Sequence, residues 1–187
     1  MSRKIVVEKY NENWPIEFEK LKKKFEEVLN ELDYRIEHVG STSVPGLAAK
    51  PILDIDIIVK NKETMEKVIE RIESIGYKHQ GDWGVPGREA FKYREGFDVE
   101  DEMEHHLYAC IDGIDSLKNH LNLKKYLSSN PEAVKEYGEL KKKLAKKYPE
   151  DIDSYVDGKT DLIVSFLAKM GMNEDSLTEI SDVNKKK

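Results

Sequence analysis

Two aspartates, Asp54 and Asp56, stand two positions apart in the apolar segment ILDIDIIV at residues 52–59. The β-branched residues around them predict a strand, whose side chains alternate between its two faces. Both carboxylates would therefore share one face, about 6–7 Å apart along the backbone. Such a pair is repulsive unless one group is protonated or both hold a cation. Because Mg²⁺ is often bound by one or two carboxylates together with substrate phosphates, the pair predicts a catalytic Mg²⁺ or Mn²⁺ site.

The loop before this strand favours the metal hypothesis. It contains a glycine and three hydroxyl residues: Gly40, Ser41, Thr42 and Ser43. Small residues after a strand let backbone N–H groups approach an anion closely, so the loop is a predicted phosphate site. A phosphate loop followed by two carboxylates suits a metal–nucleotide complex. Two plainer alternatives stay open: the D-x-D pair can be solvated or paired with Lys or Arg, and the glycine can serve the turn alone.

Further basic residues are candidates for the same site. Lys50 precedes the aspartate strand, and Lys92 and Arg94 share one face of the predicted strand EAFKYR, where they would clamp phosphates. His38 precedes the glycine loop, and Lys159 would approach the cleft from the last helix. Each of these residues, taken singly, fits a surface or structural role at least as well.

The apolar pattern predicts the elements that must position these residues. Helical spacing begins after NENWP and returns at residues 65–75, and the sequence is helical again from Asp115 to Met170. Short strands are predicted at 34–40, 52–59, 77–80, 89–94 and 105–111. The order predicts an α+β fold, a small mixed β-sheet with helices on one face plus a C-terminal helical part. We expect an α/β core at 1–114, C-terminal helices packed on it at 115–171, and a disordered tail at 172–187.

Composition excludes several classes of protein. The net charge of −6 argues against a protein that binds nucleic acid irrespective of its sequence, because such a protein needs a basic face. No apolar run approaches the roughly 18 residues that span a bilayer, so no membrane partner is expected. The start MSRKIVVEKY lacks the apolar stretch and cleavage site of a signal peptide, so no secretion is expected, and the single Cys110 precludes an internal disulfide. We therefore expect a cytoplasmic protein.

A resemblance to a known family covers nearly the whole chain to about Met170. The segment IEHVGSTSVPGLAAKPILDIDIIV resembles the signature of the GrpB family, which is similar to the nucleotidyltransferase superfamily with the polymerase-β-like fold. Further similar segments are YNENWPIEFEKLK, EHHLYA, HLNLKKYLSSNPEAVKEYGELKKKLAKKY and YVDGKTDLIVSFLAKM. The superfamily pattern is a Gly-Ser pair, a spacer, and carboxylate–apolar–carboxylate on a strand; here Gly40–Ser41 precede Asp54 and Asp56. The resemblance implies that residues 1–114 have a nucleotidyltransferase-like fold. It also implies transfer of a nucleoside monophosphate from a nucleoside triphosphate to an unknown acceptor.

One part of the superfamily pattern is missing. Active members normally add a third carboxylate from a later strand, and the matching strand here, EHHLYAC, offers only Glu104 at its edge and His106 as further metal ligands. Two alternatives to an Mg²⁺-dependent nucleotidyltransferase therefore stay open. One is a degenerate module on the same fold that only binds a nucleotide or coenzyme. The other is a transition-metal hydrolase that uses His38, His106 and the aspartates.

Overall fold

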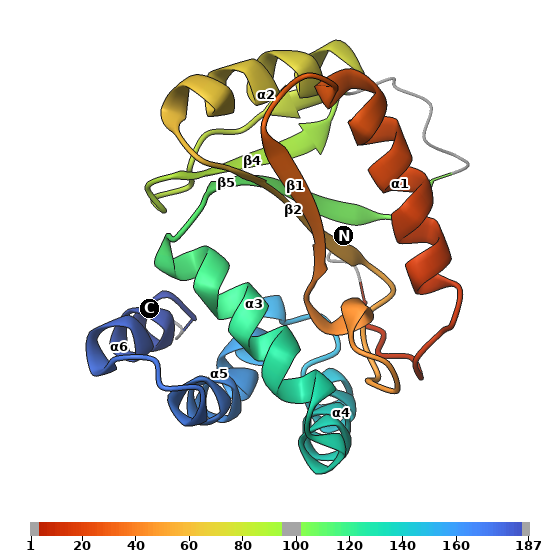
Figure 1. Ribbon diagram of the computed structural model, residues 1–187. Helices are drawn as coiled ribbons and strands as arrows, with labels where there is room; N and C mark the ends of the chain where they lie inside the picture. Colours follow the sequence, from red (N-terminus) through yellow and green to blue (C-terminus); the bar gives the residue numbers. More distant parts are fainter. Residues whose placement is uncertain (1–3, 95–101, 185–187) are drawn as a thin grey trace.

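The computed structural model describes residues 4–94 and 102–184, which form five strands and six α-helices (Figure 1). The strands are β1 (Tyr34–Val39), β2 (Leu53–Val59), β3 (Tyr77–His79), β4 (Arg88–Tyr93) and β5 (His105–Ile111). The helices are α1 (Trp14–Leu29), α2 (Lys62–Ser74), α3 (Asp115–Ser128), α4 (Pro131–Lys147), α5 (Ile152–Lys169) and α6 (Glu174–Asn184). A short 3-10 helix, η1, covers Ser41–Ser43.

The strands form one sheet in the order β1-β2-β5-β4-β3. Strands β2 and β5 run parallel, and the other neighbouring pairs are antiparallel. A parallel pair needs a long crossover, which here contains α2 and the β3–β4 hairpin. The α+β fold with a small mixed sheet that the sequence predicts is therefore confirmed.

Helices α1 and α2 cover one face of the sheet (Figure 1). The residues of β2 on that face are apolar and at most 1% exposed: Leu53, Ile55, Ile57 and Val59. They pack with the apolar stripes of the two helices, including Phe25, Leu29, Val68 and Ile72, in the main core. Since strand side chains alternate, this packing leaves Asp54 and Asp56 on the opposite face.

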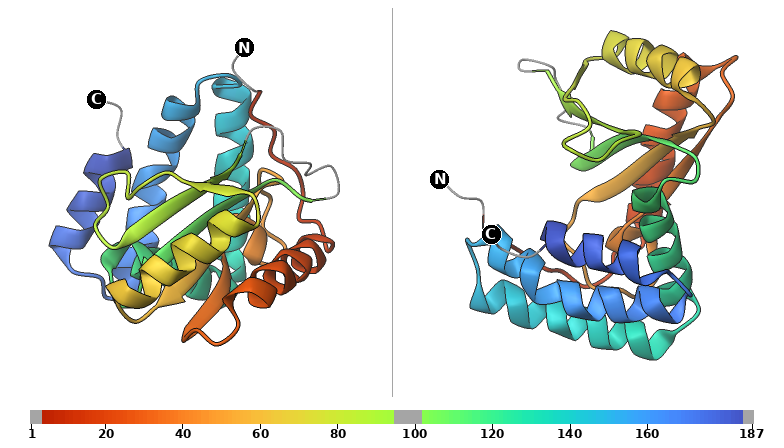
Figure 2. Two further views of the ribbon diagram at one scale, coloured as in Figure 1. Left: turned by 90° about the horizontal axis from the view of Figure 1, so that it is seen from above. Right: turned by 90° about the vertical axis from the view of Figure 1, so that its left-hand side faces the viewer.

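The opposite face is covered in part by the C-terminal helices, as the right-hand view of Figure 2 shows. Leu117 of α3 packs on Ile58 and Cys110, which are at most 2% exposed. A separate cluster joins the loop after η1 to α3, α4 and α5 through Val44, Leu47, Leu127, Tyr137 and Phe166. The aspartates thus lie between the sheet and the C-terminal helices.

The C-terminal segment differs from the expected disordered tail. Residues 174–184 form α6, which packs along α5. The Ser176 hydroxyl donates a 2.6 Å hydrogen bond to Oδ2 of Asp115 at the start of α3. Leu177 and Ile180 are three residues apart, which places both on one side of the helix, and both are partly buried. These few apolar residues suffice because α5 already offers a packing surface; residues 185–187 lie outside the described part.

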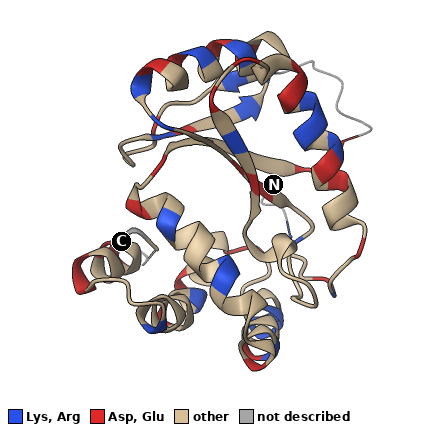
Figure 3. Ribbon diagram, viewed as in Figure 1, with Lys and Arg blue, Asp and Glu red and all other residues tan. Residues whose placement is uncertain are grey.

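Basic and acidic residues are interspersed along α1 and α2 (Figure 3). Pairs such as Lys67 and Glu63, 2.8 Å apart, lie one helical turn from each other on the surface. Among the helices of the described ranges, none combines the length and the apolar character required to cross a bilayer.

Candidate functional site

The two aspartates of β2 lie side by side on the face toward the C-terminal helices, but their surroundings differ. Oδ1 of Asp54 is 2.8 Å from Nδ1 of His106, its neighbour on β5, and the Asp54 side chain is 32% exposed. The Asp56 side chain is fully buried, and its Oδ2 is 2.7 Å from Nδ1 of His120 on α3. Asp54 is thus open to a ligand, whereas Asp56 is held inside.

One oxygen of Asp56 is left without a bond. Its Oδ1 is buried and has no hydrogen-bond partner among the described residues. A buried carboxylate oxygen normally has a partner, because leaving it without one costs free energy. The orphan atom can therefore accept a metal ion or a water molecule that is not part of the chain.

The charges around the pair keep Asp54 ionised. Burial would raise the pKa of Asp54, but the hydrogen bond and charge of His106 outweigh it. The charges of His120 and Lys159 act in the same direction, so the pKa of Asp54 lies below its usual value. Burial likewise opposes a charge on His120, yet the contact with Asp56 raises the pKa of that imidazole.

The loop of residues 40–43 is fitted closely to Asp54. Gly40 has φ +68° and ψ −169°, a conformation that residues with a side chain rarely adopt. A Cβ built on Gly40 would lie 2.1 Å from Oδ2 of Asp54. The backbone therefore approaches the carboxylate more closely than any other residue would allow.

The hydroxyl residues of this loop have different roles. Ser43 Oγ donates to the carbonyl of Gly40 at 2.7 Å, and Thr42 Oγ1 lies 3.0 Å from Nε2 of His38. Both side chains therefore fix the loop. Ser41 is hydrogen-bonded to Tyr137 of α4 and lines a cavity beside Asp54.

That cavity, of about 170 Å³, lies where the loop, β2, β5, α4 and α5 meet. It is lined by Ser41, Lys50, Ile52, Asp54, His106, Lys141, Tyr155 and Lys159. Of its described lining residues, three are lysines from three separate parts of the chain, and we call it the lysine cavity. Although the whole protein is acidic, this concave site is cationic apart from Asp54.

Two of these lysines are held in unusual surroundings. Lys141 is 1% exposed, and within the described ranges its Nζ has no hydrogen-bond partner. Its Nζ lies 4.5 Å from the ring centre of Tyr137. Burial, together with the charge of Lys159, keeps the pKa of Lys141 well below its usual value, and the charge of Asp54 acts in the opposite direction. Lys159 lies 4.6 Å from the ring centre of Tyr155.

Burial also lowers the pKa of Lys159, to about 8. The charge of Lys50 contributes to this shift and Asp54 opposes it. Desolvated ammonium groups that repel one another would be stabilised by an anion between them. The charge and burial of the lysine cavity therefore suit an anion.

Not all residues predicted from the sequence meet here. Lys50, Lys159, Ser41 and both aspartates do lie at or beside the lysine cavity, as does His106. Lys92 instead lies 5.5 Å from the ring centre of Trp83, and Arg94 Nε donates to the carbonyl of Tyr77 on the edge strand β3. Glu104 is exposed and does not line the cavity.

His38 lies on the other face of the sheet. Its register partner is Ile55, and its ring stacks on Phe18 of α1 at 4.7 Å. It is 7% exposed, and burial, aided by the charge of Lys124 and opposed by Asp54, lowers its pKa to about 4. His38 is thus a buried neutral residue that supports Thr42.

The donor set suits one Mg²⁺ ion that is shared with a ligand. Among residues 4–94 and 102–184, no group of three or more His, Cys, Asp or Glu side chains is arranged to hold a metal ion. The pair Asp54 and Asp56 remains, and one or two carboxylates completed by water and phosphate oxygens are usual for Mg²⁺. A transition-metal site of His38, His106 and the aspartates is not assembled, because His38 is on the opposite face.

Two important residues were not predicted from the sequence. His120 lies 64 positions from its partner Asp56, and nothing local connects them. Lys141 belongs to the run LKKKLAKK, which is typical of a solvated helix face. Its position, four residues after Tyr137 and three before Leu144, places it on the buried stripe of α4, and this spacing was the available signal.

The sequence profile of the GrpB protein family matches residues 4–169. The UPF0157 protein YqkA of Bacillus subtilis (strain 168) is 35% identical to this chain over 161 residues. That match covers 86% of this chain and 46% of YqkA, so the chain spans about half the length of this relative.

Solved structures give the same assignment. The crystal structure of conserved protein GrpB from Enterococcus faecalis has 32% sequence identity and a TM-score of 0.74, covering 89% of this chain and all of that one. Terminal uridylyl transferase 4 from Trypanosoma brucei with bound dUTP has 12% identity and a TM-score of 0.51, covering 92% of this chain and 59% of that one. The second likeness shows a nucleotidyltransferase-like fold and no more. The chain belongs to the GrpB family.

Proposed function

We propose that this protein transfers a nucleoside monophosphate from a nucleoside triphosphate to an acceptor, with the triphosphate bound in the lysine cavity. The observation that carries the proposal is the position of Lys50, Lys141 and Lys159 around a cavity that also borders Ser41 and Asp54. The terminal uridylyl transferase of Trypanosoma brucei is a nucleotidyl-transferring enzyme on this fold, which supports the class of substrate.

The lysine cavity matches a polyphosphate in charge and in hydrogen bonding. The ammonium of Lys141 is buried without a partner in the described part of the chain, and a phosphate oxygen would supply one. Because burial holds the pKa of Lys141 well below its usual value, the empty protein disfavours the charged form, and a bound anion would favour it. Ser41 and the backbone of the tight turn at Gly40 would add neutral donors to the same phosphates.

Asp54 and Asp56 would hold Mg²⁺ together with the phosphates, Asp56 through its unpartnered Oδ1. When bound, the metal would polarise the α-phosphoryl group and neutralise charge on the phosphates. An acceptor oxygen attacks the α-phosphorus, the bond to the oxygen that bridges the α and β phosphates breaks, and pyrophosphate leaves. Lys141 and Lys159 stabilise the negative charge that accumulates on this leaving group.

A pyrophosphate-release assay with each nucleoside triphosphate, Mg²⁺ or Mn²⁺ and a cell extract depleted of macromolecules as acceptor source tests the proposal. We expect metal-dependent release that Asp54→Asn abolishes and Lys141→Met reduces strongly. Lys142→Met is the matched control, because Lys142 is the next residue of α4 and pairs on the surface with Glu139 at 2.9 Å. Release that is equal in all three variants would contradict the proposal.

A second function is favoured by one observation. The superfamily resemblance implies a third carboxylate from the strand that corresponds to β5. The residue of β5 opposite Asp54 is instead His106, which is hydrogen-bonded to Asp54. The alternative is a non-catalytic module that binds the same nucleotides or a coenzyme. Calorimetry distinguishes the two: tight nucleotide binding that depends on Lys141, without pyrophosphate release, would identify the binding module.

A further inference from the structure

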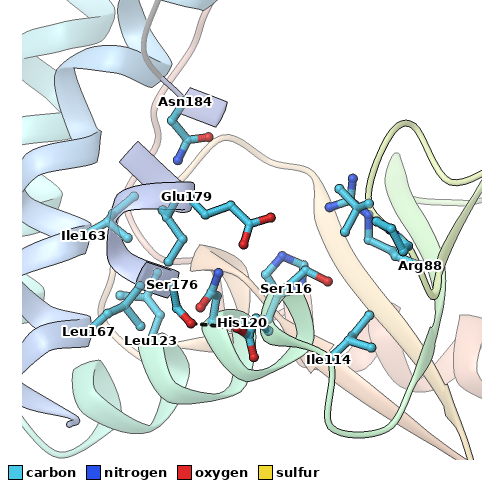
Figure 4. Close-up of a pocket in the computed structure, with 15 residues that line it drawn as sticks. Arg88, Ile114, Ser116, His120, Leu123, Ile163, Leu167, Ser176, Glu179 and Asn184 are labelled. Atoms are coloured by element: carbon cyan, nitrogen blue, oxygen red, sulfur yellow. Dashed lines mark hydrogen bonds between the residues drawn. The ribbon is translucent and has the colours of Figure 1, made fainter. Parts of the chain in front are cut away.

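A second pocket lies on the other side of the buried aspartate. It has a volume of about 340 Å³ and opens between the start of β4, the first turns of α3, and helices α5 and α6 (Figure 4). Its polar lining residues are Arg88, Asp115, Ser116, Asn119, His120, Ser176, Glu179 and Asn184. We call it the α3–α6 pocket; its volume is within the range of pockets that hold small organic ligands.

Three polar atoms in its wall have no partner in the described part of the protein. They are Nε of Arg88, Oγ of Ser116 and Oδ1 of Asn119, and all three are buried. Leaving such an atom without a partner costs free energy in the empty protein. Turned toward the pocket, these groups would offer a charged donor, a hydroxyl and an amide acceptor to a ligand that has both a carbonyl-type acceptor and an N–H or O–H donor.

The remaining walls are apolar. Ile114, Leu123, Ile163, Leu167 and Ile180 line the pocket, as do Val85 and Pro86 of the loop before β4. The guanidinium of Arg88 lies 5.0 Å from the ring centre of Tyr108. A nucleobase suits such a lining, because it has apolar faces and hydrogen-bonding groups along its edge.

The two cavities flank the carboxylate pair. Asp54 lines the lysine cavity. Asp56 is hydrogen-bonded to His120, and His120 lines the α3–α6 pocket. On β5, His106 and Tyr108 are register partners of the two aspartates and continue the same row. A ligand that lies along the partly exposed row of Asp54, His106 and Tyr108 would therefore reach from one cavity toward the other, while His120 covers the buried Asp56.

We infer that the α3–α6 pocket binds the nucleoside part of the nucleotide whose phosphates occupy the lysine cavity, and that Ser116 and Asn119 bind its base. This inference rests on the proposed function, because it places the rest of the same substrate. The α-phosphate then lies between the cavities, beside Asp54.

Helix α6 gives this pocket a wall that the family match does not include. Ser176, Glu179, Ile180 and Asn184 line it, whereas the GrpB profile ends at residue 169. Figure 4 shows Glu179 and Asn184 of α6 on one side of the pocket and Arg88 on the opposite side. Base selectivity in this chain would therefore depend on residues outside the matched segment.

Calorimetry with two probes in Mg²⁺ tests the inference. The probes are inorganic tripolyphosphate and the four common nucleoside triphosphates, and the proteins are wild type, Ser116→Ala, Asn119→Leu and the matched control Asn122→Leu. Asn122 is on the same helix and is not a lining residue of the pocket. We expect at least one nucleotide to bind wild type more tightly than tripolyphosphate. Each pocket variant should weaken that nucleotide about tenfold and leave tripolyphosphate unchanged, because each removes one hydrogen bond to the base.

The outcomes separate the two proposals. If tripolyphosphate and nucleotides all fail to bind wild type, the proposed function fails. If tripolyphosphate binds but no nucleotide binds more tightly, or if Asn119→Leu weakens the nucleotide no more than Asn122→Leu does, the inference fails and the lysine cavity stands. Thermal unfolding of each variant is the control for misfolding. Removal of an unpartnered buried group should leave the melting temperature unchanged or raise it. A lower melting temperature would assign Ser116 or Asn119 a structural role.

Discussion

The Asp54 carboxylate occupies the space that a side chain on Gly40 would need, with Oδ2 only 2.1 Å from the position of a Cβ. The loop and the carboxylate are therefore a fitted pair, and neither can shift without the other. Because Ser41 follows Gly40 directly, this contact also sets the distance between the phosphate loop and the metal-binding carboxylate of the proposed mechanism.

Gly40→Ala should destabilise the protein by about 3 kcal/mol or more, from the strained backbone conformation and the clash with Asp54 together. Gly46→Ala is the matched control. Gly46 also has a positive φ, +79°, but no described atom lies within 4 Å of the place that a Cβ would take, so only backbone strain of about 1–2 kcal/mol applies. Urea unfolding of both variants measures the difference; equal losses would show that the fit between Gly40 and Asp54 has no energetic weight.

Lys141→Met should stabilise the protein in the absence of anions, by about 1–2 kcal/mol, while it weakens tripolyphosphate binding. Methionine fills a similar volume and removes a buried amino group that has no hydrogen-bond partner among the described residues. Urea unfolding in a buffer without phosphate or sulfate measures the first effect and calorimetry the second. Lys142→Met should do neither, and a destabilised Lys141→Met protein would mean that Lys141 has a structural partner instead of a ligand.

Tripolyphosphate affinity should decrease as the pH rises through about 8. Lys159 is charged below its pKa of about 8 and loses its proton above it, so the lysine cavity loses positive charge in that range. An arginine stays charged throughout, and Lys159→Arg should therefore flatten the profile between pH 7 and pH 9. Calorimetry across this range is the measurement, and an unchanged slope in Lys159→Arg would assign the pH dependence to another group.

Stability should decrease as the pH falls from 6.5 to 4 because of His38. Above pH 6.5 the residue is neutral in both states; below it, the unfolded chain binds a proton that the folded protein does not accept until about pH 4. The loss reaches about 3 kcal/mol at the low end, at 1.36 kcal/mol per pH unit. In His38→Gln, which retains a polar atom to contact Thr42, denaturant midpoints should fall less steeply over this range. Parallel curves for the two proteins would refute this assignment.

The sheet and the loop could be predicted because their signals are local. Alternation in ILDIDIIV places Asp54 and Asp56 on one face, and the small residues at 40–43 indicate a close approach of the backbone. His120 and Lys141 could not be found this way, because α3 and α4 reach the site only through tertiary packing. Lys92 was wrongly expected at the site. It lies on the same face of the sheet as the aspartates, but β5 separates its strand β4 from β2, and the order of strands in a sheet cannot be predicted from the side-chain alternation of one strand.

The lysine cavity is built from residues that span positions 41 to 159, and Lys159 belongs to the last helix but one. A chain emerging from the ribosome would therefore have its sheet and both aspartates long before the lysine cavity is complete. Under the proposed function, nucleotide capture would begin only when α5 docks, so the growing polypeptide would be insensitive to the cellular nucleotide pool until Lys159 has been added.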